Sequence, residues 1–227
     1  PAYQVSIYYK KNILNVVDRF MGLFLPSPAN IVFLYFLGFF ILLLSLKVRP
    51  WLSLSGAIAF AFSSYFFIIL EAGHITKAHA IAYMAPVLAG IVLTYRRKYL
   101  LGAFLTALFL GLEIRANHPQ ITYYLLLIVL VFGISELIFS LKDKRFLCFV
   151  KSTAILILPV LLAVLLNIQS LWGTWQYSKY TIRSKSELSF DKKNQTSGLD
   201  KDYITAWSYG IPETLTLFIP NIYGGSS

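Results

Sequence analysis

The sequence predicts an all-α integral membrane protein with about six transmembrane helices. Of the 227 residues, 57% are hydrophobic and only 13% are charged, whereas soluble domains carry about 25% charged residues. Long uncharged windows recur along the chain, and most approach the ~20 residues that a bilayer-spanning helix needs. The net charge of +10 gathers in alternate connections between these windows. The high apolar content excludes a soluble or disordered chain. We interpret the excess of Lys and Arg as contacts with a membrane surface, and we expect no nucleic-acid partner.

The first predicted element is an amphipathic segment over residues 1–27. Ile13, Val16 and Phe20 recur at helical spacing, and Asp18 is among the charged residues of the polar side. Two prolines separate this segment from the first uncharged window. We therefore expect a helix that lies in the interface at the outer face of the membrane, and not an extension of the first span.

A bundle of six spans is predicted over residues 28–172. The spans are expected at 28–46, 51–70, 78–95, 99–113, 119–141 and 153–172. Residues 173–227 are more polar and are predicted to form an outer-face loop and the start of an extracytoplasmic region.

The fourth span is the weakest of the six. Its uncharged stretch of 14 residues covers about 21 Å, less than an apolar core about 30 Å thick. It crosses the bilayer if Lys98 and Arg115 extend to the two surfaces, or if Glu113 and Arg115 occupy a recessed, wet cavity. A re-entrant pair formed with the next helix is the alternative.

Basic residues predict the orientation of the bundle. The first, third and fifth connections carry nine Lys and Arg residues, whereas the second and fourth carry two. Short loops rich in Lys and Arg stay in the cytoplasm. Residues 71–77, 113–119 and 173–227 are therefore expected on the outer face of a bacterial cytoplasmic membrane, with the lipid bilayer as the first partner.

Polar side chains collect in the first of these outer connections, at Glu71, His74, Lys77 and His79. Lys77 and the histidines are suited to hold a phosphate, and Glu71 could orient a sugar hydroxyl or act as a base. A metal site formed by Glu71, His74 and His79 is one alternative. The other is a polar loop that caps two helices, with Lys77 extending to the surface.

The second outer connection holds Glu113, Arg115, Asn117 and His118. The planar guanidinium of Arg115 suits a phosphate, and Asn117 or His118 could donate to a sugar or phosphate oxygen. The alternative is a helix stop in which Asn117 caps the helix and Arg115 pairs with Glu113. Because both clusters fall on the same predicted face, we expect them to act together.

Seven phrases along the chain carry a family resemblance. They include EAGHITKAH and NHPQITYY, and they lie at 28–30, 57–65, 71–79, 82–90, 117–124, 197–203 and 207–214. As a set they resemble the YfhO-type family of bacterial membrane proteins, which belongs to the GT-C class of glycosyltransferases. The resemblance implies a GT-C-like bundle that takes a sugar from a polyprenyl-phosphate carrier. The acceptor would be a cell-envelope polymer or lipid on the outer face.

The resemblance also implies roles for individual residues. Lys77 and Arg115 would neutralise the carrier phosphate, and Glu71 would be a secondary candidate for the catalytic carboxylate. The principal catalytic acid of the class follows an initial span and is expected upstream of Pro1, so the chain is expected to be a piece of a longer enzyme. The resemblance implies no definite cofactor, and it leaves open whether a divalent metal ion takes part. The residues that would bind the carrier and its sugar are His74, Lys77, His79, Arg115, Asn117 and His118.

Two other functions fit the same composition. A transporter or flippase of a lipid-linked or small solute would use broken helices at mid-membrane, and Pro86 and Pro159 lie within predicted spans. The absence of Asp, Glu, Lys and Arg from the span centres argues against a coupled pump. A non-catalytic membrane scaffold, whose outer tail binds partners, is the other alternative.

Overall fold

The computed structural model describes residues 13–178, 210 and 212. The regular structure of this part is helical, with no strand. The chain divides into two units, residues 1–172 and 173–227, and most of the predicted outer segment 173–227 lies outside the described residues. The helices are α1 (Ile13–Met21), α2 (Ala29–Ser45), α3 (Pro50–Ala61), α4 (Ser64–Glu71), α5 (Ile75–Tyr95), α6 (Tyr99–Arg115), α7 (Pro119–Lys142), α8 (Phe146–Leu166) and α9 (Ile168–Ser178).

Four helical stretches of the described part are long and apolar enough to cross a membrane, namely Pro50–Glu71, α5, α7 and α8. α2 is apolar but has only 17 residues. α6 also has 17 residues, which cover about 26 Å at 1.5 Å per residue. An all-helical fold with membrane-type helices is therefore confirmed. The six spans and the GT-C-like bundle stay predictions.

Two predicted spans have different limits in the structure. The stretch predicted at 51–70 is interrupted between Ala61 and Ser64, which separates α3 from α4. The stretch predicted at 153–172 begins already at Phe146 and includes Lys151. The Lys151 ammonium lies over the ring of Tyr99, 5.1 Å from its centroid, so its charge is accommodated beside the helix.

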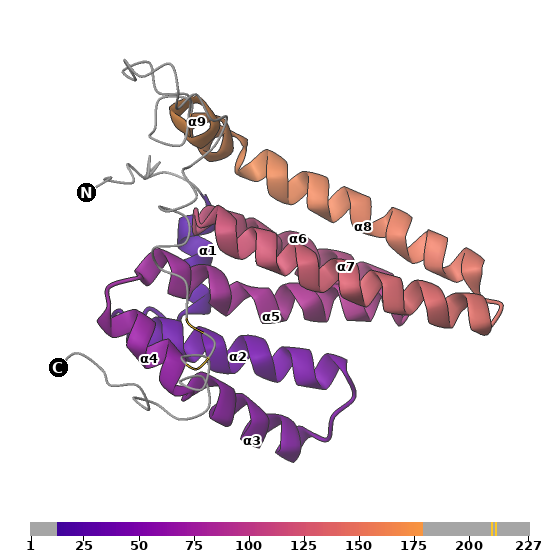
Figure 1. Ribbon diagram of the computed structural model, residues 1–227, viewed down its shortest axis with the longest axis horizontal. Helices are drawn as coiled ribbons and strands as arrows, with labels where there is room; N and C mark the ends of the chain where they lie inside the picture. The colour runs from indigo at the N-terminus through magenta and orange to yellow at the C-terminus, as the bar shows by residue number, and fades with distance from the viewer. Residues whose placement is uncertain (1–12, 179–209, 211, 213–227) are drawn as a thin grey trace. The chain divides into compact units, whose positions relative to one another are not determined.

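The core of the first unit is built around α5. This helix packs against α6 on one side and α2 on another, as Figure 1 shows. In its most apolar 18 residues 72% are buried, against 11% in α7. The buried hydroxyl of Tyr35 on α2 donates to the carbonyl oxygen of Ala78 on α5 at 2.9 Å. α5 is therefore the central helix, and α7 exposes most of its apolar surface.

Small residues let the backbones of α5 and α6 approach closely along a contact that we call the glycine seam (Gly90, Thr94, Gly102 and Thr106). A Cβ on Gly90 would stand 2.7 Å from the amide nitrogen of Thr106, and one on Gly102 would stand 2.6 Å from that of Thr94. Each threonine hydroxyl donates to the glycine carbonyl four residues earlier, at 3.0 and 2.8 Å. Small residues four apart on both helices produce this spacing.

α2, α5 and α7 end in the same way, each followed by a basic residue with a positive φ. Lys47, Arg97 and Lys144 have φ values of 64, 63 and 55°. The amide of the next residue reaches back to the last turn, as from Val48 to the carbonyl of Leu43 at 3.0 Å. This hydrogen bond satisfies a carbonyl group that the helix end leaves open. A positive charge at this position also interacts favourably with the helix dipole.

Candidate functional site

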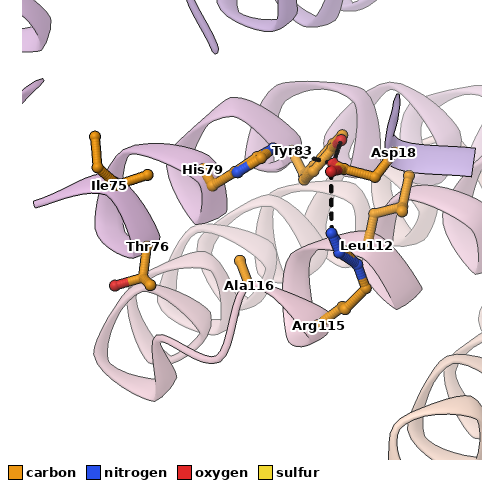
Figure 2. Close-up of a pocket in the computed structure, with 8 residues that line it drawn as sticks. All are labelled: Asp18, Ile75, Thr76, His79, Tyr83, Leu112, Arg115 and Ala116. Atoms are coloured by element: carbon orange, nitrogen blue, oxygen red, sulfur yellow. Dashed lines mark hydrogen bonds and ion pairs between the residues drawn. The ribbon is translucent and has the colours of Figure 1, made fainter. Parts of the chain in front are cut away.

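Asp18 on α1 is the centre of a polar network that joins three helices (Figure 2). Nη2 of Arg115 donates to Oδ2 at 3.0 Å, and Nε2 of His79 lies 3.0 Å from Oδ1. The hydroxyl of Tyr83 donates to the same Oδ1. Arg115 donates a further hydrogen bond from Nη1 to Oδ1 of Asn15 at 2.9 Å. These contacts hold α1 against α5 and α6.

The partners of Asp18 determine its charge. Burial alone raises the pKa of the carboxyl, but the hydrogen bonds and charges of its neighbours, chiefly His79, Tyr83 and Arg115, outweigh it. Together they lower the pKa of Asp18 to about 2. The carboxylate is therefore ionised at neutral pH. A base of such low pKa is poorly matched to proton abstraction near neutrality, so Asp18 orients His79 and Arg115.

A small cavity lies beside this network (Figure 2). Its volume is about 20 Å³, and its lining is Asp18, Ile75, Thr76, His79, Tyr83, Leu112, Arg115 and Ala116. A cavity of this size has room for about one water molecule. A ligand larger than a water molecule would therefore not fit inside the cavity.

The connection before α7 brings further predicted residues together. Burial lowers the pKa of His118, and the positive charges of Lys77 and then His74 lower it further. Nδ1 of His118 and Nε of Arg115 are buried and have no hydrogen-bond partner among the described residues. Nζ of Lys77 lies 5.6 Å from the centroid of the Tyr65 ring. We call this region the histidine end, and it comprises His74, Lys77, His79, Arg115 and His118.

The remaining predicted residues lie around the histidine end in different environments. Glu71 is exposed at the end of α4, and Asn117 has a φ of 54° between α6 and α7. Glu113 is fully buried and accepts hydrogen bonds from the Thr122 hydroxyl at 3.0 and 3.1 Å. The alternative pairing of Arg115 with Glu113 is wrong, because Arg115 pairs with Asp18.

The alternative of a metal site receives no support. The described residues contain no group of three His, Cys, Asp or Glu side chains that could hold a metal ion. Glu71, His74 and His79, which the spacing offered as ligands, therefore do not form such a group.

Sequence reasoning missed Asp18 and Tyr83 as members of the site. The amphipathic pattern places Asp18 on the polar side of an interfacial helix, yet the carboxylate contacts His79 and Arg115, whereas Ile13 and Val16 are 69% and 66% exposed. One signal was present: Tyr83 follows His79 by four residues, so both lie on the same face of a helix. The sequence does not show that Asp18, which lies on a different helix, contacts His79 and Tyr83.

The comparisons with known proteins add no relative. No protein-family model matches the sequence, and no curated protein or solved structure matches it either. The likeness to the YfhO-type family therefore rests on the sequence phrases alone.

Proposed function

We propose that this protein is a multi-pass membrane glycosyltransferase of the bacterial cytoplasmic membrane. It takes a sugar from a polyprenyl-phosphate carrier and passes it to a cell-envelope polymer or lipid on the outer face. The observation that carries this proposal is the buried Nδ1 of His118, which has no hydrogen-bond partner among the described residues; Lys77 is close enough to lower the pKa of this histidine. A lysine ammonium beside nitrogen donors at the end of apolar helices suits a ligand with an anionic phosphate head and a hydrocarbon tail.

The residues of the histidine end divide into two sets by their contacts. Arg115 and His79 already contact the Asp18 carboxylate, so we assign them to orientation and to partial charge neutralisation. Lys77 and His118 are assigned to the phosphate itself, because the buried Nδ1 of His118 has no partner within the described part. His74 and Asn117 would contact sugar or phosphate oxygens.

The proposed reaction is a displacement at the anomeric carbon of the sugar. The acceptor hydroxyl forms a bond to that carbon, the bond from carbon to the phosphate oxygen breaks, and polyprenyl phosphate leaves. The acceptor proton passes to a carboxylate, for which exposed Glu71 is a secondary candidate. Lys77 would stabilise the negative charge that develops on the departing phosphate.

Carrier binding tests this function directly. Native mass spectrometry of the protein in mild detergent with added polyprenyl phosphate should show retention by the wild type. Lys77→Gln should weaken it about tenfold, the effect of one charge-assisted hydrogen bond. Lys142→Gln, which removes a charge at the other end of the bundle, is the matched control. Equal retention by the wild type and Lys77→Gln would contradict the assignment of Lys77, and no retention by the folded wild type would contradict the function.

One observation favours a transporter as the second candidate. The helical stretch from Pro50 to Glu71 is interrupted between Ala61 and Ser64, and broken helices at membrane depth line the solute sites of many transporters. Uptake of a labelled solute by vesicles containing the protein, without transfer of a sugar, would favour this function.

A further inference from the structure

A second, larger cavity lies where α2 and α5 end, at the opposite end of α5 from the Asp18 network. Its volume is about 400 Å³, and its lining is Leu46, Lys47, Val92, Tyr95, Arg96, Arg97, Phe132, Glu136 and Arg145. We call this region the basic end. No residue of the histidine end contributes to it, so its chemistry is independent of the proposed glycosyltransferase.

Positive charge dominates the lining of this cavity. Its four cations face a single carboxylate, that of Glu136. Arg96 donates to the backbone carbonyl oxygens of Ser45 and Leu46, and Arg97 donates to Sγ of Cys148 at 3.3 Å. These acceptors carry no full negative charge. Arg145 is paired with the Asp143 carboxylate, whereas Arg96 and Arg97 take part in none of the salt bridges of the described part.

The lining of the cavity also includes apolar and aromatic side chains. The ring of Tyr95 lies 5.7 Å from that of Phe132, and its hydroxyl is within hydrogen-bond distance of Thr153, at 2.8 Å. Leu46 and Val92 also line the cavity. A cavity lined by both cations and apolar groups matches a molecule whose anionic head continues into a hydrocarbon chain.

We propose that the basic end binds the phosphate headgroup of an anionic phospholipid. The volume falls within the range of about 300–1,000 Å³ that is typical of ligand sites. Basic pockets between membrane helices bind such headgroups. A free phosphate ion would engage the cations but would leave the apolar lining residues without a contact, so the observations favour the lipid.

The backbone supplies a clean way to remove the charge. Lys47 and Arg97 both have a positive φ, and asparagine is among the residues that best tolerate this conformation. Lys47→Asn and Arg97→Asn therefore remove two cations without straining the helix ends. Lys144→Asn is the matched control, because Lys144 has the same conformation after α7 and does not line the cavity.

The experiment measures lipid retention by native mass spectrometry of the protein in mild detergent. Dioleoyl phosphatidylglycerol is added in one arm and dioleoyl phosphatidylcholine in another. The wild type should prefer the anionic lipid. The Lys47→Asn/Arg97→Asn variant should lose about thirtyfold in affinity, since each cation near a membrane surface contributes about 1 kcal/mol. The Lys144→Asn control should keep the wild-type preference.

Three results would overturn the proposal. They are equal retention of both lipids by the wild type, unchanged retention by a folded double variant, and an equal loss in the Lys144→Asn control. A third arm adds glycerol phosphate at the lipid concentration. If it displaces the phospholipid, the site takes a soluble phosphate and the lipid source is wrong. The Lys47→Asn/Arg97→Asn variant should keep the wild-type retention of polyprenyl phosphate, because neither residue belongs to the histidine end, so failure here and failure of the carrier site are distinguishable.

Discussion

At the scale of single residues, the network around Asp18 reverses the usual arrangement of an amphipathic helix. On α1 the carboxylate contacts the bundle, whereas Phe20 is 65% exposed. Only Leu14 among the apolar residues of this helix is buried. The exposed apolar surface is therefore available to the membrane interface, while charge and hydrogen bonding hold the helix in place.

Replacing Asp18 by Asn should loosen α1. The amide keeps the shape of the side chain but loses the ion pair with Arg115 and the negative charge beside His79, a loss of about 2 kcal/mol for a hydrogen-bonded charge. Hydrogen exchange of the α1 amides should become faster while α5 stays protected. Arg19→Gln, a charge change at an exposed position of the same helix, should leave α1 unchanged. Unaltered exchange in Asp18→Asn would contradict the role of this network.

Acid should release the same helix. The pKa of Asp18 is lowered from 3.8 to about 2 in the folded protein, so its ionised form favours folding. This contribution is complete above about pH 4 and disappears as the pH falls through about 2. Amide exchange of α1, corrected for the intrinsic pH dependence, should increase across that interval in the wild type. In Asp18→Asn this increase should be absent, and its persistence would assign the transition to another group.

The sequence predicted some of these residues and could not predict their contacts. His79 and Arg115 stand in polar connections, which makes them visible as candidates. Asp18 lies 61 residues before His79 and 97 before Arg115, so their meeting depends on how three helices pack. Periodicity identifies a helix face but not the neighbour against which that face lies.

At the scale of helices, the glycine seam is a direct test of the packing. Gly90→Ala and Gly102→Ala should each lower the free energy of unfolding by about 1–3 kcal/mol, the usual cost of overpacking. The new Cβ would meet backbone nitrogen at 2.7 or 2.6 Å, which a side-chain rotation cannot relieve. Unfolding with increasing SDS in mixed micelles measures the change.

Gly133→Ala is the control for the seam. A Cβ at this position in α7 has no neighbour within 4 Å. Alanine should therefore leave stability unchanged or raise it by about 0.5–1 kcal/mol, because it favours a helix over glycine. If Gly133→Ala lost as much stability as Gly90→Ala, replacing any glycine in these helices would be costly, and the effect at Gly90 would not report a close backbone contact.

The ends of a helix could be predicted from the sequence where a cluster of charged residues or a proline ends an apolar stretch. α5 ends at Tyr95, where 78–95 was expected to end, because Arg96 and Arg97 follow. The interruption between Ala61 and Ser64 was not predictable from apolar content, since Phe62 continues the apolar run. α8 begins before its uncharged window and includes Lys151, which lies over the ring of Tyr99, a contact that no local pattern contains.

At the scale of the whole molecule, the distribution of basic residues makes a prediction about orientation. With Cys148 as the native thiol, a membrane-impermeant maleimide should label it only after the cells are permeabilised. Ala72→Cys in a Cys148→Ala background should react in intact cells, since short basic loops stay inside. Both thiols should react in permeabilised cells. Reaction of native Cys148 in intact cells would reverse the orientation.

The membrane character could be predicted from the sequence because it follows from composition, whereas the sites depend on assembly. α7 and the stretch Pro50–Glu71 are apolar enough to span by themselves. The larger cavity, by contrast, needs the ends of α2 and α5 beside Phe132 and Arg145. The basic residues there were visible as topology signals, and nothing local showed that they enclose a space.

The glycine seam also limits how the protein can move. Two helices whose backbones meet at Gly90 and Gly102 cannot slide or roll past each other without lifting Thr94 and Thr106 out of their contacts. Packed elements of this kind move as one rigid body, and larger motions occur at looser contacts. Any opening of the histidine end that admits a ligand would therefore move the elements around α5 and α6, such as α1, while α5 and α6 stay a fixed frame.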